Sequence, residues 1–282
     1  MTPPPRLRPM TSADLDPAVE AILADHFGDR RAWFEFTLRS EACFPVVADV
    51  DDEVVGTGVA TVNGPVAWVG TIWVKRTHRR HGLGTALTDA VIDAATAAGA
   101  RTLVLVATDR GQPLYERMGF DVQTWYRTFE APGTGGATDA DAPAAVRAFA
   151  PSDLPEMIAL DRTATGEDRA DVLAALARPE ATRVLLGDDG AVRGFVARGP
   201  WGGGATVAPR LDDAMTILDA RRRASAPDKR VRCGILLENE AGAEALEAAG
   251  WREAWRAPRL IRGEPMHWHP EHLWGQFNHA MG

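Results

Sequence analysis

Cysteine is nearly missing from this chain. Only Cys43 and Cys233 occur among 282 residues, and they lie far apart in the sequence. Two distant thiols do not make the disulfide framework of a small secreted domain, and they suit a reducing, cytoplasmic compartment. Neither lies in a recognisable nucleophile motif, so nothing supports a covalent cysteine intermediate. We expect both to be packing residues.

Long apolar runs and an excess of basic residues are also missing. No stretch reaches the roughly 18 apolar residues of a membrane-spanning helix, and the opening MTPPPRLRPM lacks the apolar segment of a signal peptide. The 31 lysines and arginines are outnumbered by 39 aspartates and glutamates, for a formal charge of −8. These absences argue against a membrane or nucleic-acid partner and weakly favour a cationic acceptor. The single basic run, Arg221 to Arg223, lies near the expected end of a helix, where we interpret it as a solvated face.

What the chain does have is a strand-like run joined to a helix-like run by a basic loop, in VKRTHRRHGLGT at residues 74–85. Residues 67–74 are rich in valine, isoleucine, threonine and tryptophan, as strands are. Residues 85–98 carry apolar side chains at helical spacing and end at Gly99. The sequence therefore predicts a strand, a loop and a helix.

Two glycines and two arginines in this loop suit an anion. Gly82 and Gly84 leave the amides of the helix start open to a ligand, and those amides carry about half a positive charge. Arg79 and Arg80 add cations that match phosphate geometry. The loop therefore predicts a diphosphate site.

Two nucleotide-binding motifs fail here. A P-loop needs Lys and then Ser or Thr after its second glycine, whereas Gly84 is followed by Thr85 and Ala86. The dinucleotide fingerprint places Leu87 where a small residue is needed, although Asp109 lies at a suitable distance downstream.

The remaining pattern, R-x-x-G-x-G at Arg79, Gly82 and Gly84, resembles that of the GNAT superfamily of acyl-CoA N-acyltransferases. PLYERMGF at residues 113–120 is similar to the family's closing segment, in which a tyrosine one helical turn before Gly-Phe faces the cofactor sulfur. Tyr115 has that position. The resemblance implies acetyl-CoA as co-substrate and no metal, with pantetheine on the fourth strand and pyrophosphate on the loop that follows. The implied cofactor-binding residues are Ile72, Trp73, Val74, Arg79, Arg80, His81, Gly82, Leu83, Gly84 and Thr85.

A weak internal duplication predicts the architecture. RPMTSADL at residues 8–15 matches RAFAPSDL at residues 147–154. The glycine-rich residues 131–145 between the two halves indicate a linker. We therefore predict a catalytic domain at 1–138 and a second domain at 139–282. Each has the order helix, strands, helix, strand, helix, strand, and the resemblance implies a tandem α/β protein with two mixed, mostly antiparallel twisted sheets flanked by helices.

The second half departs from the family pattern at its cofactor site. After residues 205–208 it runs through Pro209 and Arg210 directly into a helix that starts with Asp212 and Asp213. Each carboxylate would repel a phosphate charge by about 2 to 3 kcal/mol. Leu246 stands where Tyr115 stands in the first half, and Asn239 alone resembles a family asparagine. We expect a degenerate domain that shapes the acceptor site.

The catalytic groups are only partly identified. An amine must lose a proton before it attacks a thioester, yet residues 67–74 contain no carboxylate. We interpret the nearest acids as solvated surface residues and assign the base to none of them: Asp25, Glu35, Glu41 and Asp109. A main-chain N–H near Trp73 and Val74 suits the developing oxyanion. Tyr115 suits protonation of the departing thiolate, with a role as a packing aromatic left open.

The acceptor is the least determined part. Residues 30–39 put Trp33, Phe34 and Phe36 on an early helix, where they either form core or border the acceptor groove. The tail at 266–282 contains His267, His269, His272 and His279 among aromatic residues. We favour an aromatic anchor against another surface, such as the first domain, over a metal site.

The sequence therefore predicts a cytoplasmic N-acetyltransferase that transfers acetyl directly from acetyl-CoA to a primary amine of a small molecule. A protein lysine or N-terminus stays open as acceptor, as does a homodimer. A non-catalytic acyl-CoA-binding or sensory module is the alternative from another class.

Overall fold

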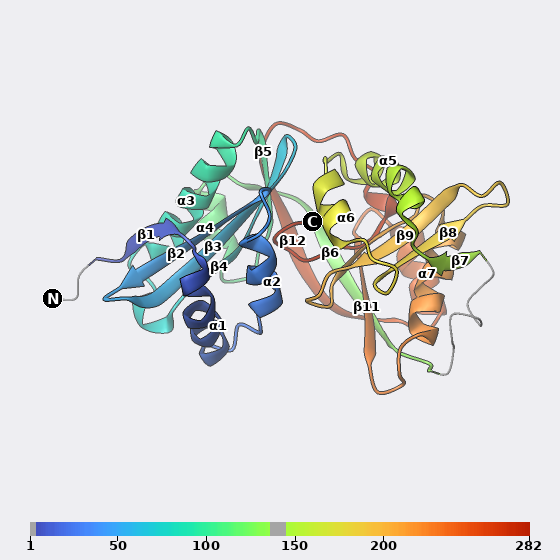
Figure 1. Cartoon of the computed structure of the whole chain (residues 1–282), viewed down its shortest axis with the longest axis horizontal. Helices are drawn as coiled ribbons and strands as arrows, with labels where there is room; N and C mark the ends of the chain where they lie inside the picture. Colours follow the sequence, from blue (N-terminus) through green and yellow to red (C-terminus); the bar gives the residue numbers. More distant parts are fainter. Residues whose placement is uncertain (1–3, 136–144) are drawn as a thin grey trace.

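The computed structural model describes residues 4–135 and 145–282. The elements of the first half are β1 (Arg6–Pro9), α1 (Leu15–Ala24), α2 (Arg31–Thr37), β2 (Cys43–Val50), β3 (Glu53–Asn63), β4 (Val66–Val74), α3 (Leu83–Ala97), β5 (Thr102–Val106), α4 (Gln112–Arg117) and β6 (Asp121–Pro132). Those of the second half are β7 (Val146–Ala148), α5 (Leu154–Thr165), α6 (Ala170–Leu176), β8 (Thr182–Leu186), β9 (Val192–Arg198), β10 (Gly204–Val207), α7 (Leu211–Arg223), β11 (Arg230–Leu236), α8 (Glu240–Ala248), β12 (Arg252–Gly263) and β13 (Leu273–Gly275). The predicted order of elements recurs in both halves, and Figure 1 shows them side by side.

The sequence repeat has a physical counterpart in two matching ion pairs. Arg8 binds both carboxylate oxygens of Asp14 at 2.7 Å. Arg147 binds those of Asp153 at 2.7 and 2.8 Å. Each pair ties the first strand of its half to the start of the first helix, since an arginine fork fits a carboxylate with two parallel hydrogen bonds. The short sequence match therefore reports one structural unit used twice.

Two glycines have the same task in the two halves. A Cβ on Gly56 of β3 would lie 2.7 Å from Cδ1 of Leu87 on α3. A Cβ on Gly194 of β9 would lie 2.9 Å from Cδ1 of Ile217 on α7. Each glycine thus lets the long helix of its half pack closely on the sheet.

The two halves exchange strands in one eight-stranded sheet of order β1-β2-β3-β4-β5-β12-β6-β11. The second-half strand β12 pairs with β5 and β6, and the first-half strand β6 pairs with β12 and β11, all antiparallel. The remaining strands form a five-stranded sheet of order β13-β10-β9-β8-β7. Figure 1 shows the red β12 beside the green β6 at the centre of the molecule. The predicted domain division at residue 138 stays a prediction, and the hydrogen-bonded sheets do not divide there.

One apolar core joins the halves. It includes Trp33 and Trp68 from the first half and Met157 and Phe195 from the second. At this junction the buried carboxylate of Glu167 accepts hydrogen bonds from Nε1 of Trp68 at 3.0 Å and Nδ2 of Asn63 at 2.7 Å. Separate cores lie under α3 and under α7 and α8. The halves are therefore packed together through their α1–α2 and α5–α6 faces.

One expectation about a boundary needs correction. Ala131 and Pro132, which we expected in the linker, end β6; residues 136–144 of that linker lie outside the described residues. The tail at 266–282 contains a further short strand, β13. Within the described residues, no helix combines the length and apolarity that a membrane crossing needs.

Candidate active site

A cleft opens where β4 and β5 separate. The two parallel strands pair only through Val66–Trp68 and Thr102–Val104. Beyond this point β4 stays paired with β3, and both Val69–Val74 and Val106–Gly111 line a cleft of about 2340 Å³. An extended chain can therefore reach backbone groups of β4 that a neighbouring strand would otherwise bind.

A bulge marks β4 at the cleft. The register with β3 shifts between Thr57 and Val59, so that Thr71 and Ile72 lie opposite Gly58 alone. Thr71 has a φ of 53°, a left-handed conformation that costs a β-branched residue about 1–3 kcal/mol. Its carbonyl accepts from Oγ1 of Thr57 at 2.9 Å, and its Oγ1 accepts from Nε1 of Trp33 at 3.0 Å. The surroundings thus hold a strained backbone at the point where sequence patterns gave no signal.

The basic loop has the predicted helix start. Gly82 is the N-cap of α3 with a φ of 81°, which suits glycine. A Cβ on Gly84 would lie 3.7 Å from Cδ2 of Leu114 and 3.9 Å from Cγ2 of Val74. Both of those residues line the cleft, so the first turn of α3 presents its backbone to it.

Arg79, which we expected to bind phosphate, is held by other groups of the chain. Its Nε donates to the carbonyl of Val74 at 2.7 Å, and its Nη2 binds Asp25. Asp25 also accepts from Nε1 of Trp73 at 3.0 Å. The interpretation of Asp25 as a solvated surface acid is therefore wrong, because this carboxylate is only 10% exposed and braces the loop against β4.

The other predicted cofactor residues divide into two groups. Ile72, Trp73, Val74, Arg79, Arg80 and Gly84 line the cleft. The side chain of Leu83 instead packs in the core under α3, while His81 and Gly82 are exposed and Thr85 is half-buried. Backbone groups of these four remain available at the helix start.

Tyr115 lies on α4 and lines the same cleft. Its ring packs edge-on against Phe120 at 6.1 Å between centroids. Burial raises the pKa of the phenol to about 12. The hydroxyl is therefore protonated at neutral pH and available as a donor.

The part of the cleft beside α2 is aromatic. Trp33 of α2 meets Trp201 edge-on at 5.1 Å between ring centroids, and Phe36 meets Trp201 at 5.5 Å. Trp33, Phe34 and Phe36 are all buried in the core, and Trp33 and Trp201 also line the cleft. That these aromatics border the acceptor stays a prediction.

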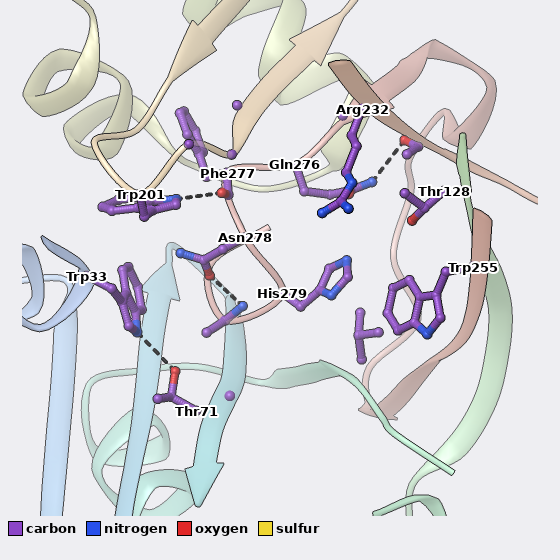
Figure 2. A pocket seen from close by; sticks show the side chains of 18 of the residues that line it. Trp33, Thr71, Thr128, Trp201, Arg232, Trp255, Gln276, Phe277, Asn278 and His279 are labelled. Carbon is purple, nitrogen blue, oxygen red and sulfur yellow. Dashed lines mark hydrogen bonds between the residues drawn. The ribbon is translucent and has the colours of Figure 1, made fainter. Parts of the chain in front are cut away.

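The tail of the chain crosses to the first half, as the aromatic-anchor interpretation predicted. Oγ1 of Thr61 donates to the carbonyl of Ala280 at 2.8 Å. His279 stacks on Tyr126 and Trp255 at 5.6 and 5.3 Å between ring centroids. Figure 2 shows Trp33 and Trp201 on one side of the tail and His279 and Trp255 on the other. Burial lowers the pKa of His279 to about 4, so its imidazole is neutral at pH 7.

Acidic groups along the cleft give no clear base. The carboxylates in its lining are those of Asp25, Asp29, Asp109 and Glu180. Asp25 is occupied by Arg79 and Trp73, and Asp109 and Glu180 are exposed. Glu35 and Glu41 do not contribute to the lining.

In the second half, the edge of β10 that corresponds to the open edge of β4 is covered by another strand. β13 pairs with β10, and Ala208 donates its backbone N–H to the carbonyl of His272 at 3.0 Å. At the start of α7, Arg193 binds Asp213 with two hydrogen bonds of 3.1 and 2.5 Å. Leu246 is fully buried on α8. Asn239 caps α8 by accepting from the N–H of Gly242 at 2.9 Å, which is a structural role.

The histidines of the tail lie in two different places, with His279 at the cleft and His269 and His272 away from it. His269, Glu271 and His272 have ligand atoms within 4.8 Å of one another, close enough to hold a metal ion, but they do not line the cleft. Cys43 and Cys233 are free and buried, as expected of packing residues. Burial raises the pKa of both thiols, that of Cys233 to about 12.

Comparison with solved structures agrees with this fold. An acetyltransferase candidate from Pyrococcus horikoshii shares 22% identity with a TM-score of 0.81, over 99% of this chain and 96% of that one. A tandem GNAT protein from the clavulanic acid biosynthesis pathway shares 17% identity with a TM-score of 0.62, over 93% and 99%. A GCN5-related N-acetyltransferase from Sphaerobacter thermophilus shares 17% identity with a TM-score of 0.61, over 94% and 98%.

Family models match both halves. Residues 9–120 match the model described as acetyltransferase (GNAT) family, and residues 157–275 match the model described as acetyltransferase (GNAT) domain. No curated protein sequence matches the chain. Because the two GNAT models together cover most of the chain, it belongs to the GNAT acetyltransferase family, in the tandem two-domain form.

Proposed function

We propose that the chain is an acetyl-CoA-dependent N-acetyltransferase that transfers acetyl directly to a primary amine of a small molecule. The observation that carries this proposal is the convergence of three features on one cleft: the gap between β4 and β5, the glycine start of α3 and Tyr115. In this proposal the main chain of Ile72–Val74 holds the pantetheine arm. The amides from Arg80 to Thr85 hold the pyrophosphate.

The bulge of β4 and Tyr115 divide the chemistry between them. A neutral amine attacks the thioester carbonyl, and main-chain N–H groups at Thr71 and Ile72 stabilise the charge on its oxygen. Collapse breaks the C–S bond, and Tyr115 gives its proton to the sulfur. The attacking nitrogen releases one proton to water as the amide forms, and the Tyr115 phenolate takes a proton back from water, so that the enzyme returns to its starting state. With the phenol pKa at about 12 and a thiol near 8.5, full transfer is uphill by about 5 kcal/mol. This is well below the barrier of about 16 kcal/mol for a turnover of about 10 per second.

The second half supports a small acceptor. Trp201, Trp255 and His279 come from the second half and line the cleft opposite β4. In this proposal these three aromatic side chains cover the thioester position, and such a covered site suits a compact molecule better than a folded polypeptide.

A two-part measurement tests the proposal. Calorimetry with coenzyme A measures binding, and release of free thiol from acetyl-CoA across a panel of small amines, lysine peptides and N-terminal peptides measures turnover. Gly84→Val fills the phosphate cradle and is expected to weaken coenzyme binding about 100-fold, the loss of two charge-assisted hydrogen bonds. The control is Ala86→Val, which adds the same side chain at an exposed position of the same helix.

The alternative is a non-catalytic acyl-CoA-binding module. It is favoured by the occupied or exposed state of the cleft carboxylates, which leaves no evident base. Tight coenzyme binding without thiol release across the whole panel would establish it. No binding in the wild-type protein would reject both readings.

A further inference from the structure

The second-half part of the cleft carries a concentration of positive charge that coenzyme binding does not explain. The lining of this part includes one carboxylate, that of Glu180, and six arginines: Arg183, Arg198, Arg221, Arg223, Arg230 and Arg232. Arg223 pairs with Asp219 and Arg232 with Glu130, so the positive charge considered below is that of Arg198 and Arg221. The whole chain has a formal charge of −8. A cleft lined by one sign of charge attracts ligands of the other sign.

Arg221 is the centre of this region, and it corrects the interpretation of residues 221–223 as a solvated face. The helix C-terminus favours cations there, and the two neighbours fit that account. Arg222 donates to the carbonyls of Pro132 and Ala249, and Arg223 pairs with Asp219 at 2.7 Å. Arg221 instead turns into the cleft, where its Nη1 is buried without an acceptor among residues 4–135 and 145–282.

A second cation lines the same part of the cleft. Arg198 lies at the end of β9 and lines the cleft together with Arg221. Burial, together with the charge of Arg198, lowers the pKa of the Arg221 guanidinium to about 10. In the described parts of the chain, neither guanidinium makes an ion pair or a side-chain hydrogen bond. A buried guanidinium nitrogen without an acceptor, beside a second cation, is unfavourable unless an anion binds there.

The same region has room for a ligand. Small residues line it: Gly202, Gly203 and Gly204, and Ala220 and Ala224 beside Arg221 and Arg223 in the sequence. The whole cleft, at about 2340 Å³, exceeds the roughly 300–1000 Å³ of a usual small-molecule site. It therefore accommodates a second molecule beside the coenzyme.

We propose that Arg198 and Arg221 form an anion site for the carboxylate or phosphate group of the acceptor, which makes the acceptor an amine with a separate acidic group. The identification of the anion with the acceptor rests on the proposed function. The anion site itself does not. Arg221, Gln276, His279 and the bulge of β4 line one and the same cleft. In this proposal one acceptor molecule reaches from the anion site to the bulge.

The first experiment needs no coenzyme. Thermal unfolding is measured in chloride and in inorganic phosphate or malonate at equal ionic strength, and calorimetry measures phosphate binding. The wild-type Tm is expected to rise with phosphate. Arg221→Met is expected to lose this response, to weaken phosphate binding at least about tenfold, and to melt no lower than the wild type in chloride, because it removes an unpaired buried charge.

Arg210→Met is the matched control, since it removes an exposed cation from the other end of α7 near Asp213. It should respond to phosphate as the wild type does. An unchanged wild-type Tm, or an equal phosphate response in Arg221→Met, overturns the anion site. Arg198→Met gives a second variant at the exposed member of the pair, with the same expected loss.

The second experiment separates the acceptor from an independent anionic ligand. Matched amines with and without a carboxylate or phosphate are compared by kcat/KM, and Arg221→Met should raise KM at least about tenfold for the acidic member alone. Phosphate binding without this preference assigns the site to a separate anion and overturns the acceptor class. Loss of phosphate binding in Arg221→Met with no turnover on any amine leaves the anion site standing while the proposed function fails.

Discussion

The two halves contain the same elements in the same order, yet only the first keeps a gap between its parallel strands. In the first half β4 leaves β5 after Trp68, and a glycine loop leads into α3. In the second half β13 occupies the edge of β10, and Arg193 and Asp213 pair at the start of α7. Three local differences therefore separate the second half from the proposed cofactor site of the first, while the repeated core survives: a filled gap, an acidic helix start and Leu246 in place of Tyr115.

The halves also depend on each other. In the eight-stranded sheet, β12 of the second half lies between β5 and β6 of the first half, and β6 lies between β12 and β11 of the second half. Neither half therefore has all of its strand partners when it is alone. The second half is therefore needed to complete the fold of the first half, in addition to any role at the acceptor. The two GNAT domains therefore share sheet hydrogen bonds as well as an apolar core.

Separating the halves is expected to have the largest effect. Residues 1–138 alone lack β12, which leaves β5 and β6 with unpaired backbone groups. We expect no cooperative thermal transition in circular dichroism from either 1–138 or 139–282 alone. Co-expression of both pieces should restore one transition and coenzyme binding, and a folded 1–138 that binds coenzyme would show that the exchange is dispensable.

Removing the hydroxyl of Tyr115 tests the third difference between the halves. Tyr115→Phe is expected to lower kcat about 100-fold, the lower end for loss of a general acid, because a phenol with a raised pKa is a weak donor. Calorimetry should find coenzyme affinity within about twofold of the wild type. The control is Tyr126→Phe, at the chain's other tyrosine, and an equal fall in kcat there would assign the effect to packing.

The sequence could predict what depends on short-range pattern. The match of Arg8 and Asp14 with Arg147 and Asp153 predicts the repeat, because each ion pair closes within one strand-to-helix turn. The strand, loop and helix around Gly82 follow from periodicity and turn chemistry. The placement of Tyr115 beside that loop came from the family resemblance.

Long-range pairing could not be predicted in this way. The periodicity of β12 is the same whichever strands lie beside it, so the exchange leaves no local trace. β13 has only three residues, too few for an alternating pattern. Likewise, Arg221 lies in a run of three arginines, and only the packing of α7 shows that Arg221 and Arg223 line the cleft and that Nη1 of Arg221 is buried there without an acceptor among the described residues.

The smallest expected effect concerns His279, whose imidazole lines the cleft from the second half. Because burial lowers the pKa of His279 to about 4, it is neutral at pH 7 but far too weak a base for an amine with a pKa near 10. His279→Phe retains an aromatic ring between Tyr126 and Trp255, and we expect kcat/KM to change less than about threefold. Both proteins should show kcat/KM rising about tenfold per pH unit up to the pKa of the acceptor amine. A plateau above pH 5 in the wild type, lost with about 100-fold of activity in His279→Phe, would instead make the tail a source of catalytic groups; otherwise the second half supplies the walls of the site and the first half its chemistry.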